Sequence, residues 1–479
     1  MFHRELLVNG NLVGGPCDGT VPKEVSRNPW SGATVGSYAE ATWAHCDAAL
    51  DGATNAFASW SRTPISDRRR LLRDISNALG EKRADFAELL VHEVGKPISW
   101  ARAEVDRAAL TFALAADHPV ELDTPDLSRD PRATNYRATV HRKPRGVVLA
   151  FTPSNWPLNL AAHKIAPALL AGNTVVIKGS DQSALCTLSL ARLIHQCGCP
   201  AGVVNAVQPL IVDAQRMVAD RRVRHISFTG SAAVGWTIRE RRFDIPVTLE
   251  LGGNAFAIVL DDADPEATAR ILATSAYGFA GQVCISAQHV LATPAVYASL
   301  RQALTMATAS MKVQDPAEDS TVCGPLLIEQ ASERVEAWVA ESNGRILAGG
   351  PRMRNRMTPT LVEIDDFESA QARGEKLATE EVFGPVLTIS PVPDFETALR
   401  LVNRSQYGIH AALFTDDRAA MDHAAQHLTA GGLVVNDAPS VRFDALPYGG
   451  EKRSGFGREG IASAYDDFTV PFSVVERIS

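Results

Sequence analysis

Short apolar runs alternate along the chain with longer stretches in which apolar residues recur at helical spacing. In the first half, strands are expected at residues 146–151, 174–178, 202–207, 225–229 and 247–251. Segments long enough for helices separate these runs, and such a βαβ rhythm is typical of a parallel sheet. Before the first strand, apolar residues recurring on one face predict helices over residues 51–60, 67–83 and 84–95.

A second series of the same kind follows Gly253 and predicts a second α/β lobe. Its strands are expected at residues 256–260, 289–292, 386–390, 411–414 and 432–436. Two segments fit neither series: residues 119–144 are polar without helical period, and residues 468–477 are β-prone but too isolated to form a sheet alone. Such pieces usually pair with another subunit or lobe.

Composition narrows the range of partners. The 479 residues are 46% hydrophobic and carry a net charge of −8, with acidic and basic residues interspersed, which argues against nucleic acid and acidic membrane surfaces. No apolar stretch has the length of a signal peptide core or a membrane span, so a cytoplasmic protein is expected. Seven cysteines, an odd number, indicate reduced thiols. Cys197 and Cys199 have no second ligand pair, and no metal site is expected.

The strongest chemical signal is Cys284, which ends the run Gly281-Gln282-Val283-Cys284, 34 residues after Glu250. A lone cysteine is most often a buried core thiol. Glu250, however, ends an apolar run just before Gly252-Gly253, where burying a carboxylate without a role would be costly. A third signal is Asn155, in a loop between Pro153 and Pro157: its amide is either free to donate to a developing oxyanion or part of a turn.

Weaker signals point to a nucleotide. The segment 228–235 reads as a strand that runs into a Gly-marked helix start, where backbone N–H groups could meet a pyrophosphate, although it is not a G-x-G-x-x-G fingerprint. Lys178 and Asp181 are placed either to bind a ribose or to form a solvated ion pair. The segments 380–386 and 447–455 could be ordinary loops.

Together and in this order, these six motifs resemble the aldehyde dehydrogenase superfamily, over a span from Asn28-Pro29 to the C-terminal strand. The resemblance implies an α/β fold with a Rossmann-type NAD(P)-binding domain (1–119 and 142–252), a catalytic domain (253–446) and a β oligomerisation arm (120–141 and 462–479). It makes Cys284 the nucleophile and Glu250 the general base. Asn155 and the Cys284 backbone N–H would be the oxyanion donors, and the arm segments would pair across subunits in a homodimer or homotetramer.

The resemblance also implies an NAD or NADP site. Gly179 stands where the family usually has Pro, and Asp181 where Glu is common, so cofactor choice is left open. An acid at the ribose disfavours a 2′-phosphate, which favours NAD. The implied cofactor residues are Thr152, Pro153, Trp156, Lys178, Ser180, Asp181, Phe228, Thr229, Gly230, Ser231, Gly235, Leu251, Gly252, Glu381 and Phe383.

The implied substrate tunnel is more polar than is usual in the family. Arg107 and Arg442 in one tunnel suggest a small aldehyde that is anionic, bearing phosphate, phosphonate or carboxylate, or else hydroxylated. The pattern resembles the branch that oxidises glyceraldehyde 3-phosphate, phosphonoaldehydes and lactaldehyde, although Val283 stands where members handling phosphate or phosphonate often have Arg. Alternatively, these arginines form ion pairs beside Asp106 and Asp444. A CoA-acylating semialdehyde dehydrogenase and a catalytically silent protein on this scaffold remain alternatives. The implied substrate-binding residues are Arg107, Asn155, Trp156, Asn159, His163 and Arg442.

Overall fold

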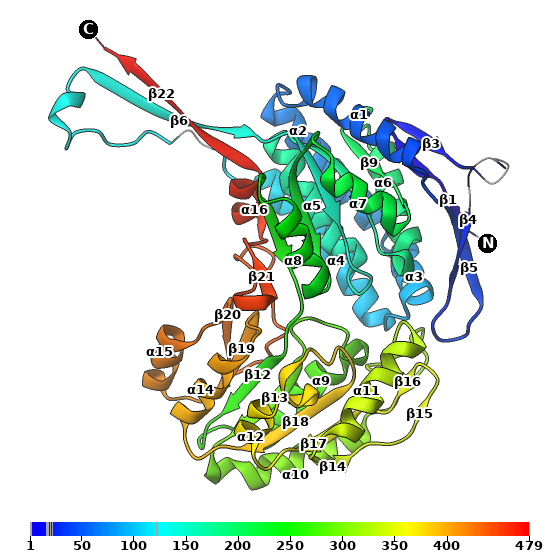
Figure 1. The fold of residues 1–479 in the computed structure, drawn as a ribbon, viewed down its shortest axis with the longest axis vertical. Helices are drawn as coiled ribbons and strands as arrows, with labels where there is room; N and C mark the ends of the chain where they lie inside the picture. The colour runs from blue at the N-terminus through cyan, green and yellow to red at the C-terminus, as the bar shows by residue number, and fades with distance from the viewer. Residues whose placement is uncertain (1, 16–18, 20, 22, 121–122, 479) are drawn as a thin grey trace.

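The structure, a computed structural model, describes residues 2–15, 19, 21, 23–120 and 123–478. Two lobes lie one above the other, and a two-stranded ribbon projects from the upper lobe (Figure 1). The upper lobe contains an eight-stranded sheet with the order β21-β11-β10-β7-β8-β9-β2-β3. Its strands are β2 (Leu6–Val8), β3 (Asn11–Val13), β7 (Val147–Phe151), β8 (Thr174–Lys178), β9 (Val204–Ala206), β10 (Val223–Thr229), β11 (Val247–Glu250) and β21 (Gly455–Phe456).

Four parallel strands of this sheet bring the predicted site residues to one edge. The chain runs outward from β7 to β8 and β9 on one side, and through β10 and β11 on the other. The reversal of strand order between β7 and β10 is the place where open α/β sheets bind ligands, beyond the carboxyl ends of the strands. Phe151 pairs in register with Lys178 and with Phe228, and Thr229 pairs with Glu250.

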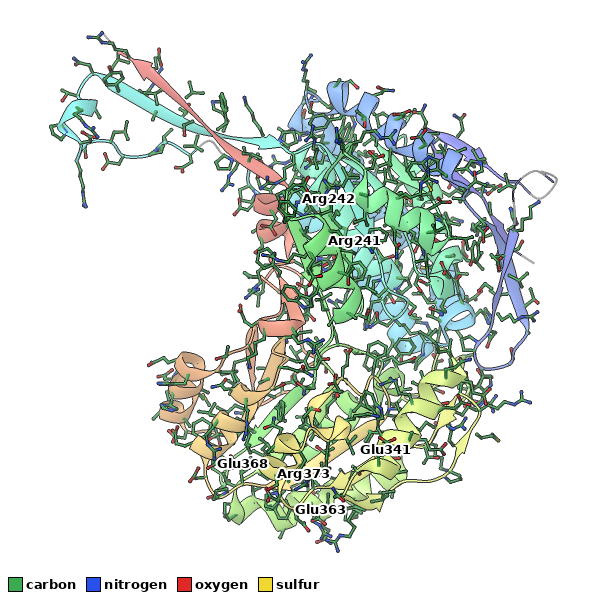
Figure 2. All side chains as sticks on the ribbon, in the orientation of Figure 1. Arg241, Arg242, Glu341, Glu363, Glu368 and Arg373 are labelled. Atoms are coloured by element: carbon green, nitrogen blue, oxygen red, sulfur yellow. The ribbon has the colours of Figure 1, made fainter. Side chains whose placement is uncertain are left out.

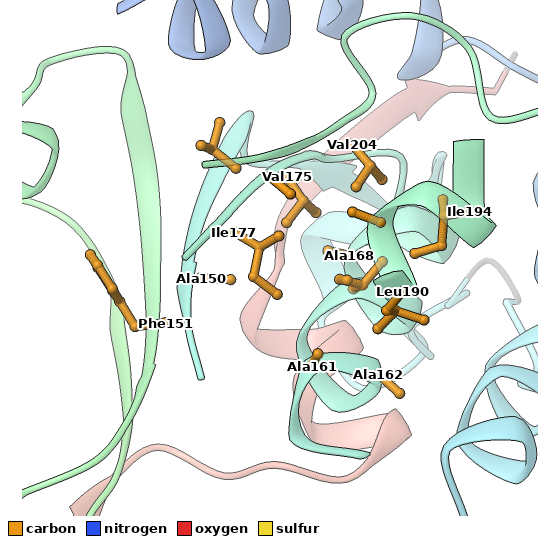
Figure 3. Packing of buried hydrophobic residues seen from close by; sticks show 14 of the residues in the cluster. Ala150, Phe151, Ala161, Ala162, Ala168, Val175, Ile177, Leu190, Ile194 and Val204 are labelled. Atoms are coloured by element: carbon orange, nitrogen blue, oxygen red, sulfur yellow. The ribbon is translucent and has the colours of Figure 1, made fainter. Parts of the chain in front are cut away.

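Helices cover the upper sheet, and one of them is fully buried. Every residue of α5 (Pro157–Ala171) is buried, as expected for a helix that is apolar on all sides. Ala161, Ala162 and Ala168 give it a narrow surface that packs close to β7, β8 and α6 (Figure 3). The other helices are α1 (Trp43–Trp60), α2 (Ile65–Glu81), α3 (Arg83–Val94), α4 (Ile98–Asp117), α6 (Ala184–Gln196), α7 (Ile211–Ala219), α8 (Ala232–Arg241) and α16 (Ile461–Asp467).

The lower lobe contains a seven-stranded sheet of order β14-β17-β18-β13-β12-β19-β20, parallel except for β14. The predicted strands are confirmed here and in the upper lobe to within a few residues. The strands are β12 (Ala255–Val259), β13 (Ala287–Ala292), β14 (Arg345–Ala348), β17 (Thr360–Glu363), β18 (Val386–Pro391), β19 (His410–Phe414) and β20 (Gly432–Val435). The helices are α9 (Pro265–Tyr277), α10 (Pro294–Ser310), α11 (Glu329–Glu341), α12 (Phe367–Ala372), α13 (Lys376–Thr379), α14 (Phe395–Arg404) and α15 (Arg418–His427).

Smaller sheets complete the fold. A three-stranded sheet of order β1-β5-β4 lies beside the upper lobe, and β15 and β16 form a hairpin in the lower lobe. In the part of the chain that the structure describes, no helix combines the length and apolarity needed to cross a bilayer. The bounds are β1 (Phe2–Arg4), β4 (Lys23–Arg27), β5 (Thr34–Ala39), β15 (Arg352–Met353) and β16 (Arg356–Met357).

The two segments that fitted neither series pair with each other. β6 (Tyr136–Pro144) and β22 (Thr469–Arg477) form an antiparallel ribbon, from the pair Pro144–Thr469 to the pair Tyr136–Arg477. The expected partner was another subunit or lobe; within the chain the two segments pair with each other, and pairing across subunits stays a prediction. Residues 121–122 of the predicted arm lie outside the described residues, as does Cys17, and the other six cysteines are free thiols.

Candidate active site

Cys284 lies in a short loop between η3 (Gly278–Gly281) and β13. Phe279 and Ala280 in this turn adopt left-handed backbone conformations, with φ of 51° and 55°, which non-glycine residues rarely adopt outside functional sites. Cys284 is half-buried, and its Sγ lies 3.2 Å from the hydroxyl of Tyr448. Burial raises the pKa of the Cys284 thiol to about 12, although the Tyr448 contact works in the opposite direction.

Glu250 ends β11 and is 3% exposed. Neither of its carboxylate oxygens has a hydrogen-bond partner among the described residues. Burial, together with the negative charge of Glu459, raises the pKa of Glu250 well above its usual value. A Cβ atom at Gly449 would approach Glu250 Oε1 to 2.9 Å, so the glycine-rich loop 447–455 leaves space for this carboxylate. The expectation that the Glu250 carboxylate is buried is confirmed.

Asn155 lies in the loop after β7 and contacts the loop that carries Cys284. Its Nδ2 donates to the carbonyl of Gln282 at 2.9 Å, and its Oδ1 accepts from the Trp156 N–H at 3.1 Å. The Asn155 amide is therefore partly engaged, and its role as an oxyanion donor stays a prediction. An amide nitrogen carries two hydrogens, so one donor of Asn155 remains beyond the Gln282 contact.

A pocket of about 140 Å³ opens beside Cys284. Trp100 and Trp156 form an aromatic wall, with ring centroids 6.2 Å apart, and Arg107 lies 5.2 Å above the Trp156 ring. Ser440 and Asn159 add hydrogen-bonding groups. The full lining is Trp100, Arg107, Asn155, Trp156, Asn159, Leu160, Val283, Cys284, Ile285, Ser440, Arg442 and Tyr448.

Both predicted arginines line this pocket, but carboxylates of the same chain hold them. Arg107 makes a two-pronged contact with Asp444, at 3.0 and 2.6 Å. Arg442 is nearly buried and contacts Glu459 at 3.2 Å and Asp444 at 3.6 Å. The alternative of ion pairs with Asp444 is confirmed for both Arg107 and Arg442, whereas Asp106 pairs with Arg83.

His163 does not line the pocket, contrary to the expectation from its helical spacing. α5 begins only at Pro157, after Asn155, and its first turns are packed against other elements. His163 is fully buried, and its Nε2 lies 2.9 Å from Asp444 and 3.3 Å from Arg442. Burial lowers the pKa of His163, and the Arg442 charge adds to this effect, so the ring is neutral near pH 7.

A buried ion-pair network continues behind Arg442. Glu459 accepts from Lys164 at 2.9 Å as well as from Arg442. Although burial works in the opposite direction, the charges of Lys164 and Arg442 lower the pKa of Glu459 to about 2. The pKa of Asp444 also lies below its usual range, because His163 and Arg107 outweigh the effect of burial. Three cations, Arg107, Arg442 and Lys164, thus face two ionised carboxylates.

The predicted adenosine-side residues meet at the carboxyl edge of the upper sheet. Lys178 Nζ lies 2.8 Å from Asp181, and the side chain of Gln208 also donates to Asp181 at 2.6 Å. The Ser180 hydroxyl accepts from the backbone N–H two residues on and does not face Lys178. Thr152 Oγ1, at the end of β7, is buried and has no partner within the described residues.

The start of α8 lies at the same sheet edge. Ser231 is its N-cap residue but makes no side-chain capping bond, which leaves the first backbone N–H groups of the helix available. Space here is tight: a Cβ at Gly230 would meet the Phe228 ring at 2.7 Å, and one at Gly235 would meet Leu251 at 2.3 Å. Glycine at these two positions therefore leaves room for the Phe228 ring and the Leu251 side chain.

Glu381 reaches the same crevice from the lower lobe. The Gly253 N–H donates to Glu381 Oε1 at 3.1 Å, and a Cβ at Gly252 would collide with this carboxylate. Burial raises the pKa of Glu381 to about 7. Phe383, two residues later, has a φ of 45°, a strained conformation for an aromatic residue.

Three residues of the site were not singled out from the sequence: Tyr448, Glu459 and Lys164. Tyr448 lies in the glycine-rich segment 447–455, which the sequence alone does not distinguish from an ordinary loop. Glu459 follows it, in the run Gly457-Arg458-Glu459-Gly460. Lys164 is adjacent to His163 on a helix that is otherwise apolar. Lys164 could have been found from the sequence as a charged residue in a largely apolar helix, because a charged side chain is buried only when it has a partner.

Comparison with known proteins identifies the family. The aldehyde dehydrogenase family matches residues 19–474. The 3-sulfolactaldehyde dehydrogenase of Priestia aryabhattai is 36% identical over 88% of this chain and 87% of its own length. The lactaldehyde dehydrogenase of Methanocaldococcus jannaschii is 34% identical, over 92% and 95% respectively. The NADP-dependent glyceraldehyde-3-phosphate dehydrogenase of Bacillus halodurans, solved with NADP, superposes with a TM-score of 0.94 at 32% identity and covers both chains completely.

The chain belongs to the aldehyde dehydrogenase family. It is an enzyme, an aldehyde dehydrogenase that uses NAD or NADP, and the predicted α/β fold class is confirmed.

Proposed function

We propose that the enzyme oxidises a short aldehyde with an anionic head group to the carboxylic acid, through a thioester on Cys284. The Cys284 sulfur adds to the aldehyde carbon, and the carbonyl electron pair moves to oxygen. The remaining Asn155 amide hydrogen and the Cys284 backbone N–H stabilise this oxyanion. As the oxyanion collapses, a hydride would leave the substrate carbon for the nicotinamide ring, and a thioester would remain on Cys284. Glu250 then takes a proton from water, whose oxygen attacks the thioester carbon; the acid leaves, and the Cys284 thiolate takes up the proton.

The residues at the sheet edge fit the nicotinamide cofactor. Bound there, NAD or NADP would accept the hydride that leaves the substrate carbon. The unpartnered Thr152 hydroxyl and the uncapped start of α8 offer donors to its phosphates, and Lys178 and Asp181 offer a donor and an acceptor to a ribose. Glu381 and Phe383 would hold the other ribose. Asp181 already has two partners and carries a negative charge, so we expect NAD to be preferred over NADP.

One observation carries the substrate proposal: the pocket beside Cys284 is lined by two arginines within a group of three cations and two carboxylates. This group retains one positive charge. A sulfonate or phosphate group would be attracted to it, and guanidinium forks match the oxygens of such groups. Ser440 and Asn159 are suited to hydroxyl groups on the same short chain. Among the relatives, the sulfolactaldehyde and glyceraldehyde-3-phosphate enzymes are named for small anionic aldehydes, and the lactaldehyde enzyme for a small neutral hydroxyaldehyde.

The test compares an anionic aldehyde with a neutral one of similar size, with NAD and with NADP and without CoA. Arg107→Leu should lower kcat/KM for the anionic substrate by roughly 30- to 150-fold, the equivalent of about 2–3 kcal/mol for a lost charge-assisted contact, and should change kcat/KM for the neutral aldehyde little. Arg442→Leu should lower kcat/KM for the anionic substrate by more than for the neutral one, because Arg442 also contacts the Tyr448 ring beside Cys284. Arg400→Leu, on the surface of the lower lobe, is the matched control. Preference of the wild type for hexanal, or equal losses on both substrates, would overturn the proposal.

We further propose a homodimer or a dimer of dimers built on the β6–β22 ribbon. The exposed apolar side chains of Val470, Phe472, Val474 and Val475 give the ribbon a surface suited to a second copy. Light scattering that finds only a 51.4 kDa monomer at micromolar concentration would contradict this assembly.

A further inference from the structure

The Tyr448 hydroxyl has an unusual position in this site. It lies 3.2 Å from Cys284 Sγ, on a side chain that is 4% exposed, and this sulfur is its only hydrogen-bond partner among the described residues. A phenol is a better hydrogen-bond donor than a thiol. Once Cys284 has lost its proton, the hydroxyl is the only one of the two groups that can donate.

Three contacts hold Tyr448 in this orientation. Its backbone forms a two-way bridge with Glu459, through a 2.9 Å bond from the Tyr448 N–H and a 2.6 Å bond back to its carbonyl. The guanidinium of Arg442, itself fixed by the Glu459 carboxylate, lies 3.6 Å from the centroid of the Tyr448 ring. His410 packs edge-on against the same ring at 5.2 Å. The hydroxyl is therefore positioned before any substrate arrives.

The groups around Cys284 explain why such a donor is needed. Burial disfavours its thiolate, and the carboxylates of Glu381 and Glu250 add to this effect, whereas Tyr448 and Arg442 favour the thiolate. Arg442 acts from the far side of the tyrosine ring, so Tyr448 is the group that touches the sulfur. The pKa of Tyr448 is itself raised well above its usual value by burial, so the hydroxyl keeps its proton while the thiol loses one.

We propose that the Tyr448 hydroxyl donates a hydrogen bond to the Cys284 thiolate and is a catalytic residue of the acylation step. The thiol proton leaves to a base, the hydroxyl stabilises the charge left on sulfur, and the sulfur electron pair forms the bond to the aldehyde carbon. Tyr448 transfers no proton. This inference rests on Cys284 being the nucleophile, as proposed above, but not on the identity of the aldehyde.

The test follows alkylation of Cys284 by iodoacetamide against pH, read by mass spectrometry of the peptide that contains it, with and without NAD. Tyr448→Phe keeps the ring and its packing but removes the donor. The apparent pKa of Cys284 should rise by about one unit, which means about tenfold less thiolate at a given pH. Tyr297→Phe is the matched control, because its hydroxyl contacts Glu363 in the lower lobe, and its profile should follow the wild type.

Superimposable profiles for folded Tyr448→Phe and wild type would overturn the proposal. If the variant does not fold, 2,3,5-trifluorotyrosine at position 448 provides a second test with almost no change in shape. Its more acidic hydroxyl is a stronger donor, so the apparent pKa of Cys284 should fall, and an unchanged value would equally overturn the proposal. The readout reports on the sulfur alone. Failure of Cys284 as the nucleophile would instead appear as turnover by Cys284→Ala.

Discussion

In two adjoining regions of the site, the pKa values of buried acidic groups are shifted in opposite directions. Around Cys284 and Glu250, burial is not compensated: the carboxylate has no protein partner, and both groups are held in their neutral forms. In the network of Asp444 and Glu459, each carboxylate has two or more cationic or hydrogen-bonding partners, and both pKa values fall. The carboxylates of the two regions are buried to a similar degree, since Glu250 is 3%, Asp444 5% and Glu459 2% exposed. The difference teaches that partners, and not depth, decide whether a buried acid is a potential base or a structural anion.

The largest effect is expected from the uncompensated region, at the nucleophile. Cys284→Ala should lower turnover by at least about 10⁴-fold, because no other group can form the thioester. Its thermal midpoint and cofactor binding should stay close to wild type, since the side chain is small and half-buried. Cys197→Ala, at the end of α6, controls for loss of a thiol and should remain fully active. Wild-type turnover by Cys284→Ala, measured from NADH absorbance, would show that the proposed nucleophile is wrong.

Glu250→Gln should act on one phase of the reaction. Thioester hydrolysis should slow by about 10³-fold while acylation is largely preserved, so stopped-flow traces should show a burst of one NADH equivalent followed by slow turnover. A carboxyl with a raised pKa is protonated below that pKa, so the wild-type hydrolysis rate should increase with pH until the group ionises. The variant should lose this limb of the profile. Equal slowing of both phases would point to an earlier proton transfer.

Asp444→Asn should lower the free energy of unfolding, because Asp444 belongs to the ion-pair network with Arg107 and Arg442. Removing one charge of a buried group leaves Arg107 and Arg442 with an incomplete set of partners, which should cost on the order of 3 kcal/mol of unfolding free energy at pH 7. The folded-state pKa of Asp444 lies below the ordinary value of 3.8, so its contribution is present above that value and is lost as pH falls. The difference between the urea titrations of variant and wild type should therefore begin to shrink below about pH 4 and disappear only once the pH has also passed below the folded-state pKa. A difference independent of pH would contradict this account.

The smallest effect is expected at an exposed ion pair, which extends the comparison to the surface. Glu368 contacts Arg400 and Arg404 on the lower lobe, where all three side chains are about half exposed (Figure 2). Water and salt screen such contacts, so Glu368→Gln should leave the urea midpoint within experimental error of wild type. A change in the urea midpoint as large as that of Asp444→Asn would mean that the number of charged partners determines the contribution of an acid to stability even when the acid is exposed.

The parts that could be predicted from the sequence are those set by local pattern. Five strands of each large sheet follow from apolar runs, and the position of Glu250 follows from an apolar strand that ends just before Gly-Gly. The strands β2, β3, β14, β17 and β21 were not expected. The domain boundaries and the residue roles stay predictions. Partner choice was harder, because Arg107 pairs with Asp444, 337 residues away, and not with its neighbour Asp106. The pairing of β6 with β22 could not be predicted for the same reason: the two strands are far apart in the sequence, and neither one shows which segment it pairs with.

The strand order of the upper sheet has a consequence for how the protein is made. Glu250 lies on β11, whose outer neighbour β21 is contributed by Gly455 and Phe456, near the end of the chain. During translation, the edge of the upper sheet at β11 therefore stays unpaired until β21 has been synthesised. The strands of the lower sheet, from Ala255 to Val435, can assemble before that. The lobe that is translated first is completed last. A nascent chain that stalls before residue 455 would expose β11 and the carboxylate at its end, and we expect chaperones to recognise that intermediate.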